Sequence, residues 1–88
     1  MDMYLTLENG KKLKASMWED SVITVREPVD GYHVVADKLA DGKWYAYVQG
    51  SDRTREILKK MTNPSHHVDG GQETPDKAVS WLMGLGDL

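Results

Sequence analysis

Apolar and polar side chains alternate along residues 1–18, with a break at an Asn-Gly pair. The apolar positions are Met1, Met3, Leu5 and Leu7 before the break, and Leu13, Ala15 and Met17 after it. A period of two is typical of strands with one buried face. A two-residue loop would set the two apolar rows on opposite sides, whereas a three-residue loop pairs Leu5 with Leu13 and brings both rows to one side. We therefore predict a hairpin closed by a type I turn with a bulge at Gly10.

Three further strands are predicted before residue 50. The segment SVITVRE (21–27) is rich in β-branched residues and ends before Pro28, which cannot donate to a ladder. The segments YHVVAD (32–37) and WYAYVQ (44–49) flank a second glycine turn, and the same bulged register sets Val34 opposite Val48 and Ala36 opposite Ala46. Short strands joined by Asn-Gly and Asp-Gly turns indicate a four- to five-stranded antiparallel meander over residues 1–49.

The pattern changes to a helical period after residue 50. Residues 51–62 begin with Ser51 as a predicted N-cap and end before Asn63-Pro64. The apolar stripe of this helix is made by Thr54, Ile57, Leu58 and Met61. On its opposite side, Glu56 and Lys60 have the spacing of a favourable ion pair.

A loop over residues 63–73 leads to a second predicted helix over residues 74–83. Thr74 is the expected N-cap, Pro75 occupies the first helical position, and Gly84 or Gly86 ends the helix. The prediction for the whole chain, residues 1–88, is a single α+β domain with the meander followed by two helices packed on one face. We expect the first helix to cover the face that bears Leu5, Leu7, Leu13, Ala15 and Met17.

Composition narrows the chemistry without naming a function. The 88 residues contain no cysteine, which excludes disulfides, thiolate metal sites and thiol nucleophiles within them. No apolar run approaches the roughly 18 residues that a membrane span needs, and we expect a cytoplasmic protein. The net charge of −3 argues against general binding to phosphate backbones.

The segment NPSHHVDGGQ in the 63–73 loop is the best candidate for a metal or catalytic site. His66, His67 and Asp69 offer three ligand atoms, but adjacent side chains diverge in an extended segment, and no recognised ligand spacing is present. Gly70-Gly71 is typical of a flexible connection, and we interpret the segment mainly as a linker. Neither His33 nor the adjacent Glu19 and Asp20 belongs to a catalytic pattern, so we predict no catalytic residue, no enzyme activity and no cofactor.

Two surfaces are better candidates for binding a partner. The first is the sheet face that carries Tyr4 and Trp18 beside Lys12 and Lys14. These rings are suited to a protein interface or to stacking on single-stranded bases, and the alternative is packing against the helices or each other. The second is the C-terminal helix, whose apolar residues sweep about 200° of its circumference. That arc predicts either burial on two sides or a contact with another chain, such as a homodimer.

Three functional hypotheses follow. The first is a small non-enzymatic protein-interaction module, an inhibitor or adaptor of the kind by which phages and mobile elements block host proteins such as nucleases. Its predicted partner-binding residues are Tyr4, Trp18, Trp81 and Leu85. The second is a small nucleic-acid-binding or regulatory domain, which the acidic net charge makes the weaker hypothesis. Its predicted contacts are Lys11, Lys12 and Lys14 with Trp18, or Arg53, Arg55, Lys59 and Lys60. The third is a metal-binding domain that uses His66 and His67.

Overall fold

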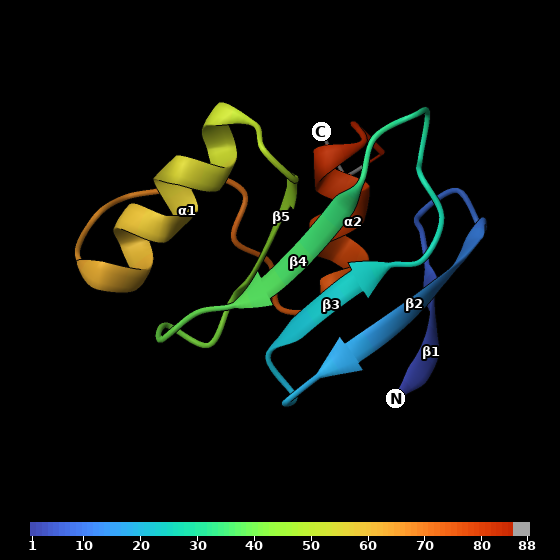
Figure 1. The fold of residues 1–88 in the computed structure, drawn as a ribbon, viewed down its shortest axis with the longest axis horizontal. Coiled ribbons are helices and arrows are strands. Elements are labelled where there is room, and N and C mark those ends of the chain that lie inside the picture. The colour runs from blue at the N-terminus through green and yellow to red at the C-terminus, as the bar shows by residue number, and fades with distance from the viewer. Residues whose placement is uncertain (86–88) are drawn as a thin grey trace.

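The computed structural model describes residues 1–85 and has one antiparallel sheet followed by two helices (Figure 1). The five strands lie in chain order across the sheet, so the predicted meander and the α+β class are confirmed. The strands are β1 (Asp2–Thr6), β2 (Lys12–Trp18), β3 (Val22–Val25), β4 (Val34–Lys38) and β5 (Trp44–Val48), and the helices are α1 (Asp52–Thr62) and α2 (Pro75–Leu82).

The predicted hairpin registers are confirmed. Leu5 lies opposite Leu13 in the β1–β2 pair, and the Leu7 N–H donates to the Lys11 carbonyl at 2.8 Å. Gly10 adopts a φ of 86°, a left-handed conformation in which a Cβ atom is unfavourable. The β4–β5 hairpin repeats this pattern, with Val34 opposite Val48. Both apolar rows therefore reach the same side of the sheet.

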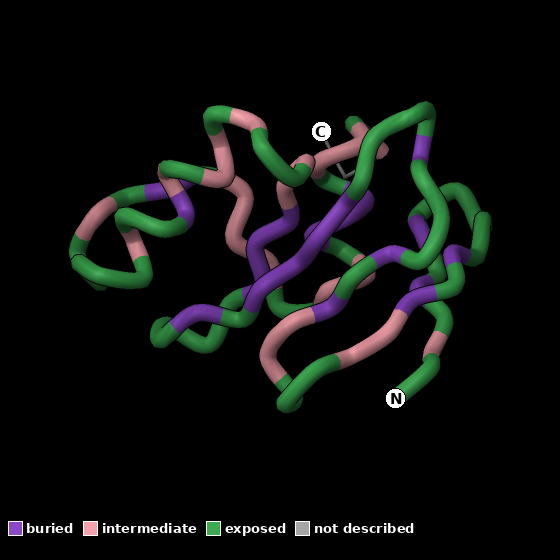
Figure 2. Tube along the Cα trace, viewed as in Figure 1, coloured by how far each residue is buried: buried purple, intermediate pink, exposed green. Residues whose placement is uncertain are grey.

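The main hydrophobic core lies between that side of the sheet and α2. In Figure 1, α2 lies behind the sheet, and the buried residues of Figure 2 follow the middle of the sheet and this helix. Ala78 and Val79 of α2 are fully buried in a cluster that includes apolar residues of all five strands, and α2 contacts mainly β5 and β4. The sheet residues of this core are Leu5, Leu13, Ala15, Ile23, Val25, Val34, Ala36, Trp44 and Ala46.

Helix α1 packs on the opposite side of the sheet, and the expectation that it covers the Leu5 face is wrong. Successive residues of a strand point to opposite faces, and β5 uses both of them. Trp44 and Ala46 join the main core, whereas Tyr45 belongs to a second cluster that includes Ile57 of α1. Both helices contact the sheet, but they do not share one face.

The apolar surface of each helix explains this arrangement. In α1 the one buried residue is Ile57, whereas Leu58 and Met61 of the predicted stripe are 55% and 44% exposed. Helix α2 instead buries three consecutive residues, Ala78, Val79 and Ser80. The more apolar helix therefore covers the larger part of the sheet, and α1 covers only the edge at β5.

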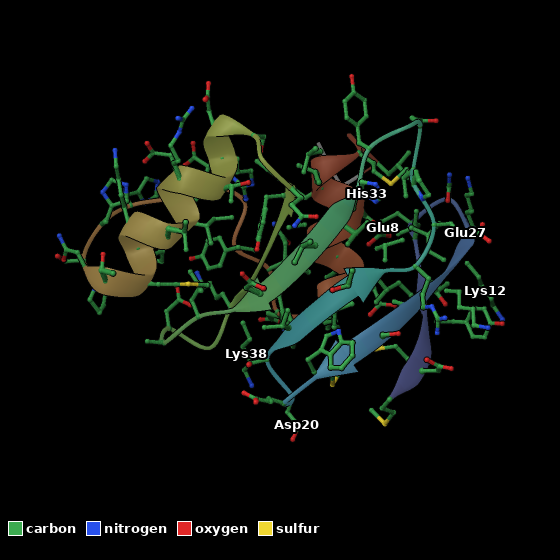
Figure 3. The ribbon with its side chains drawn as sticks, viewed as in Figure 1. Glu8, Lys12, Asp20, Glu27, His33 and Lys38 are labelled. Atoms are coloured by element: carbon green, nitrogen blue, oxygen red, sulfur yellow. The ribbon has the colours of Figure 1, made fainter. Side chains whose placement is uncertain are left out.

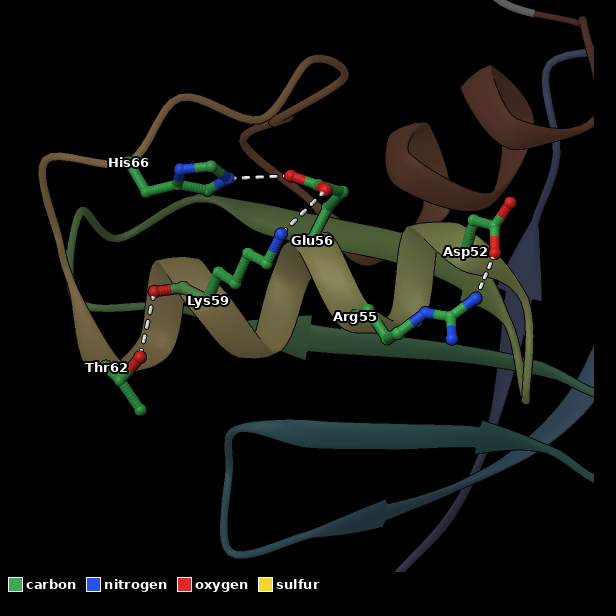
Figure 4. Close-up of polar contacts among 6 residues, drawn as sticks. All are labelled: Asp52, Arg55, Glu56, Lys59, Thr62 and His66. Carbon is green, nitrogen blue, oxygen red and sulfur yellow. Dashed lines mark hydrogen bonds and ion pairs between the residues drawn. The ribbon is translucent and has the colours of Figure 1, made fainter.

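The charged side chains of α1 also pair differently from the prediction. Glu56 contacts Lys59 at 3.5 Å and the His66 ring at 2.7 Å, rather than Lys60 (Figure 4). Lys60 instead approaches Asp41, with 3.7 Å between Nζ and Oδ2, and donates to the His66 carbonyl. The ion pairs therefore tie the end of α1 to neighbouring loops.

Both ends of α2 have the predicted caps. The Thr74 hydroxyl accepts the Lys77 N–H at 3.2 Å, which satisfies one of the free amides at the helix start. At the other end, the Leu85 N–H donates to the Ser80 carbonyl and Gly84 has a φ of 73°, the geometry of a Schellman motif. Gly86, the alternative end, lies outside the described residues.

Helix α2 also protects the free edge of the sheet. Its Asp76 carboxylate accepts the Thr6 N–H at 2.7 Å, and its Ser80 hydroxyl accepts the Glu8 N–H at 3.1 Å. These amides would otherwise be unpaired along the outer side of β1. No helix within residues 1–85 has the length and apolar character needed to cross a membrane.

Candidate functional site

The sheet has one large surface that neither helix covers. It consists of the side chains of β1–β3 that point away from α2, together with the residues that continue β3 and precede β4. We call this surface the open face. Its residues are Asp2, Tyr4, Thr6, Lys12, Lys14, Ser16, Trp18, Val22, Thr24, Arg26 and His33. Figure 3 shows Lys12 at the end of the sheet near β1 and β2, and His33 just before β4.

Two aromatic rings stand on the open face. Tyr4 is 62% exposed and Trp18 is 60% exposed. They alternate along their strands with buried core residues such as Leu5, so their outward direction follows from the same period of two that builds the core. Tyr32, in the β3–β4 connection, is also 60% exposed and was not predicted as a site residue.

Positive charge gathers on the open face although the chain is acidic. Lys14 pairs with Tyr4 across β1–β2, and the Arg26 N–H donates to the Lys14 carbonyl, so these three residues form a row across the strands. Lys12 adds another cation at the start of β2. The acidic residue within the open face is Asp2, whose Oδ1 accepts from Arg26 at 3.0 Å and from the Ser16 hydroxyl at 3.3 Å.

An open hollow of about 530 Å³ lies beside the Asp2–Arg26 ion pair. Its lining includes Asp2, Ser16, Trp18, Thr24, Arg26 and His33. Sequence reasoning missed Arg26 and His33 as part of this surface. The information was present, because Arg26 has the same strand parity as Thr24, and His33 precedes a residue of the main core.

Trp81 packs within the molecule rather than standing free. Its side chain is partly exposed, at 38%, and the Arg53 guanidinium lies 4.7 Å from the ring centroid. Gly70 presses against the same ring so closely that a Cβ atom there would lie 2.6 Å from it. Arg53 also donates to the backbone carbonyls of Ala46 and Asp69, at 2.5 and 2.8 Å. Trp81 and Arg53 therefore join α1, α2 and the 63–73 loop.

Leu85 packs against the main core, so both predicted anchors in the C-terminal segment have intramolecular partners. Trp81 still keeps 38% of its surface exposed, so the burial of this helix is partial. The homodimer through α2 stays a prediction.

The remaining cations of α1 do not form one patch. Arg55 pairs with Asp52, and Lys59 pairs with Glu56 (Figure 4). The Lys60 side chain is only 11% exposed beside Asp41. Lys11 lies exposed in the β1–β2 turn, next to the open face.

The two histidines of the loop contact separate carboxylates. His66 Nε2 lies 2.7 Å from Glu56 Oε2, and His67 Nε2 lies 2.8 Å from Asp69 Oδ1. The hydrogen bond with His66 lowers the pKa of Glu56. Within residues 1–85, no three His, Cys, Asp or Glu side chains come together as a metal ion would require. In the structure, His66 and His67 each contact one carboxylate, Glu56 and Asp69 respectively.

The loop of residues 63–73 also packs against β5. Gln72 exchanges two backbone hydrogen bonds with Trp44, at 2.7 and 2.9 Å, which adds a bridge to the edge of β5. Gly71 lies against the Tyr45 ring, where a Cβ atom would be 2.7 Å away. The glycine pair is therefore needed for close approach to two aromatic rings, a packing role that the interpretation as a flexible connection did not include.

Two tyrosine–aspartate pairs lie under α1. The Tyr45 hydroxyl donates to Asp41 at 2.6 Å, and the Tyr47 hydroxyl donates to Asp37 at 2.9 Å. Burial and the bond to Asp41 raise the pKa of Tyr45 to about 12, so this phenol stays neutral. Burial also raises the pKa of Asp37, whose Oδ1 has no hydrogen-bond partner. These pairs are part of the packing under α1, on the far side of β4–β5 from the main core.

Comparison of the chain with protein-family models, curated proteins and solved structures finds no match.

Proposed function

We propose that this chain is a small, non-enzymatic protein-interaction module that binds a partner protein through its open face. The observation that carries the proposal is the exposure of Tyr4 and Trp18 on a sheet surface that no helix covers. Trp, Tyr and Arg are the residues most enriched at energetic centres of interfaces. The open face supplies all three types, with Lys12 and Lys14 as a charged border.

The division of the sheet supports this role. The main core lies on one side of β1–β3, so the residues of the open face contribute no side chain to that core. Binding by such a surface requires no catalytic group. A module of this kind acts by occupying a surface of another macromolecule, as an inhibitor or adaptor does, and a host nuclease blocked by a phage or mobile-element protein is the model we favour.

Affinity capture with matched variants tests the proposal. Wild-type protein, Tyr4→Ala, Trp18→Ala and the control Leu58→Ala would be used as baits in a lysate of the host cell. Leu58 is 55% exposed but lies on α1, outside the open face. We expect each aromatic variant to weaken binding of the captured protein by about 2 kcal/mol or more, and the control to keep it. Equal capture by folded Tyr4→Ala and Trp18→Ala proteins would contradict the proposal.

A second candidate function is binding of single-stranded nucleic acid by the same surface. The row of Lys14 and Arg26 crosses the strands beside Tyr4, and Trp18 lies four residues further along β2 on the same face, a combination suited to phosphates and stacked bases. A fluorescent oligothymidylate titrated at increasing salt tests it. Three phosphate contacts predict a slope of about −2 in log affinity against log salt. A flat response, or no binding at low salt, would exclude this function.

A further inference from the structure

The hollow on the open face collects hydrogen-bond donors around one carboxylate. Arg26, His33, Ser16 and Thr24 all line it, and the Asp2 carboxylate is the anionic group among its lining residues. Asp2 Oδ1 accepts hydrogen bonds from both Arg26 and Ser16. The site is thus arranged to hold a carboxylate oxygen, and a side chain of the chain itself holds that position in the free protein.

The internal carboxylate is held weakly. The side chains of Arg26 and Asp2 are 47% and 63% exposed, and exposed ion pairs of this type contribute only about 0–1 kcal/mol. A carboxylate on a partner can therefore replace Asp2 at little cost. It would gain the apolar surface of Trp18 beside it, which the small side chain of Asp2 does not cover.

We infer that the protein partner presents an Asp or Glu side chain to this hollow, where its carboxylate replaces Asp2 on Arg26 and Ser16. The inference rests on the proposed function and specifies the partner's chemistry. The Trp18 ring covers the apolar part of the incoming segment, and His33 and Thr24 lie in the lining of the same hollow.

The charges around the hollow favour an acidic side chain over a nucleic-acid strand. A single carboxylate needs one cation, which Arg26 provides once the Asp2 side chain, 63% exposed, turns outward to solvent and away from the incoming like charge. A phosphate chain that ran along β2 past Trp18 would approach Glu19 and Asp20, which follow directly in the exposed β2–β3 turn. Like charges at that end of the path would oppose such a strand.

Binding of defined probes tests this inference. The probes are a short peptide of Glu, Tyr and Gly, its counterpart with Gln in place of Glu, and an oligothymidylate, each followed through the backbone amide signals of the full chain. We expect the Glu peptide to shift signals around the hollow and the Gln peptide to bind at least about tenfold more weakly, because charge-assisted hydrogen bonds are the stronger ones.

Three variants make the test specific. Arg26→Gln should weaken the Glu peptide about tenfold or more, since it removes the charged donor. Asp2→Asn should tighten it about two- to fivefold, since it weakens the internal competitor. Lys59→Gln, which removes one positive charge from α1, is the control and should change affinity little. If the Glu peptide were bound only by a general attraction to positive charge, Arg26→Gln and Lys59→Gln would weaken its binding equally.

Several results would overturn the inference. These are equal binding of the Glu and Gln peptides, weaker binding by Asp2→Asn, tighter binding of the oligothymidylate at the same signals, or no binding of any probe to the hollow. Capture of the natural partner separates this failure from that of the proposed function. If Trp18→Ala loses capture but Arg26→Gln keeps it, only the inference of a partner carboxylate is refuted. If both variants capture the partner fully, the proposed binding role of the open face is refuted as well.

Discussion

Replacing Gly70 by alanine should destabilise the protein far more than a typical loop substitution. Gly70 has a φ of +85°, and a Cβ atom there would lie 2.6 Å from Cζ3 and 2.7 Å from Cε3 of Trp81. The ring cannot move away freely, because the Arg53 guanidinium lies on it. Two costs therefore combine at one residue: the left-handed backbone and the overlap with an aromatic ring.

The two costs can be separated with glycines elsewhere in the chain. Gly42 has a φ of +80° with no atom within 4 Å of the added Cβ, so Gly42→Ala measures the backbone cost alone, about 1–2 kcal/mol. Overpacking adds about 1–3 kcal/mol at Gly70. We expect Gly70→Ala to lower the free energy of unfolding by about 2–5 kcal/mol in total. For a domain of this size the whole stability is only about 4–13 kcal/mol.

Urea denaturation followed by circular dichroism measures these differences, provided that the m-value stays constant. The melting temperature should fall by about 4–8 °C for each kcal/mol. Repeating Gly70→Ala in a Trp81→Leu background tests the assigned cause. With the ring removed, Gly70→Ala should cost no more than Gly42→Ala.

Equal destabilisation by Gly70→Ala and Gly42→Ala in the wild-type background would refute this reasoning. The same conclusion would follow if removal of the Trp81 ring left the cost at Gly70 unchanged. Either result would mean that the 63–73 loop does not pack against α2 in solution as it does in the structure.

Four further substitutions test other parts of the structure. Asp37→Asn should become more stable relative to wild type as the pH rises above 3.8. The pKa of Asp37 is raised in the folded state, so the wild-type protein loses the contribution of this group when the carboxyl ionises, whereas the variant does not. An equal difference in free energy of unfolding between variant and wild type at acidic and at neutral pH, measured with urea, would contradict this. Thr74→Ala should cost about 1 kcal/mol in the same assay, because it removes the cap on Lys77, and an unchanged midpoint would argue against that bond. Glu19→Gly should raise the melting temperature, since Glu19 has a φ of 52°, and a lower value would show that the side chain stabilises the turn. Trp18→Ala should leave the melting temperature within a few degrees, because its side chain is mostly exposed, and a large fall would place it in the folding core.

The sequence determined much of the local structure. The alternation of apolar residues and the need to bring Leu5 and Leu13 to one side specified the β1–β2 register and the left-handed Gly10. Thr74 and Pro75 specified the start of α2. The same period of two put Tyr4 and Trp18 on the outer face. These features depend on neighbours in the chain or across a short turn, where backbone geometry leaves few alternatives.

Only part of the open face was predicted from the sequence. Lys12, Lys14, Tyr4 and Trp18 share a surface that the pattern predicted, whereas Arg26 and His33 were missed, although strand parity and the predicted order of β2, β3 and β4 place them on it. Trp81 and Arg53 were predicted as exposed contact residues on separate helices. The tertiary structure placed them against each other.

The side of the sheet chosen by each helix was decided only by the tertiary structure. A helical stripe shows that a helix has an apolar face, but it does not say which surface that face meets. The choice depends on how much apolar area each docking buries and on which connections can reach, and both are properties of the assembled sheet. Helix α2 packs mainly against β5 and β4 and buries Ala78 and Val79 in a core to which all five strands contribute, while α1 is left with the edge at β5. The result is an open face over β1–β3, a surface defined by which strands the two helices leave uncovered.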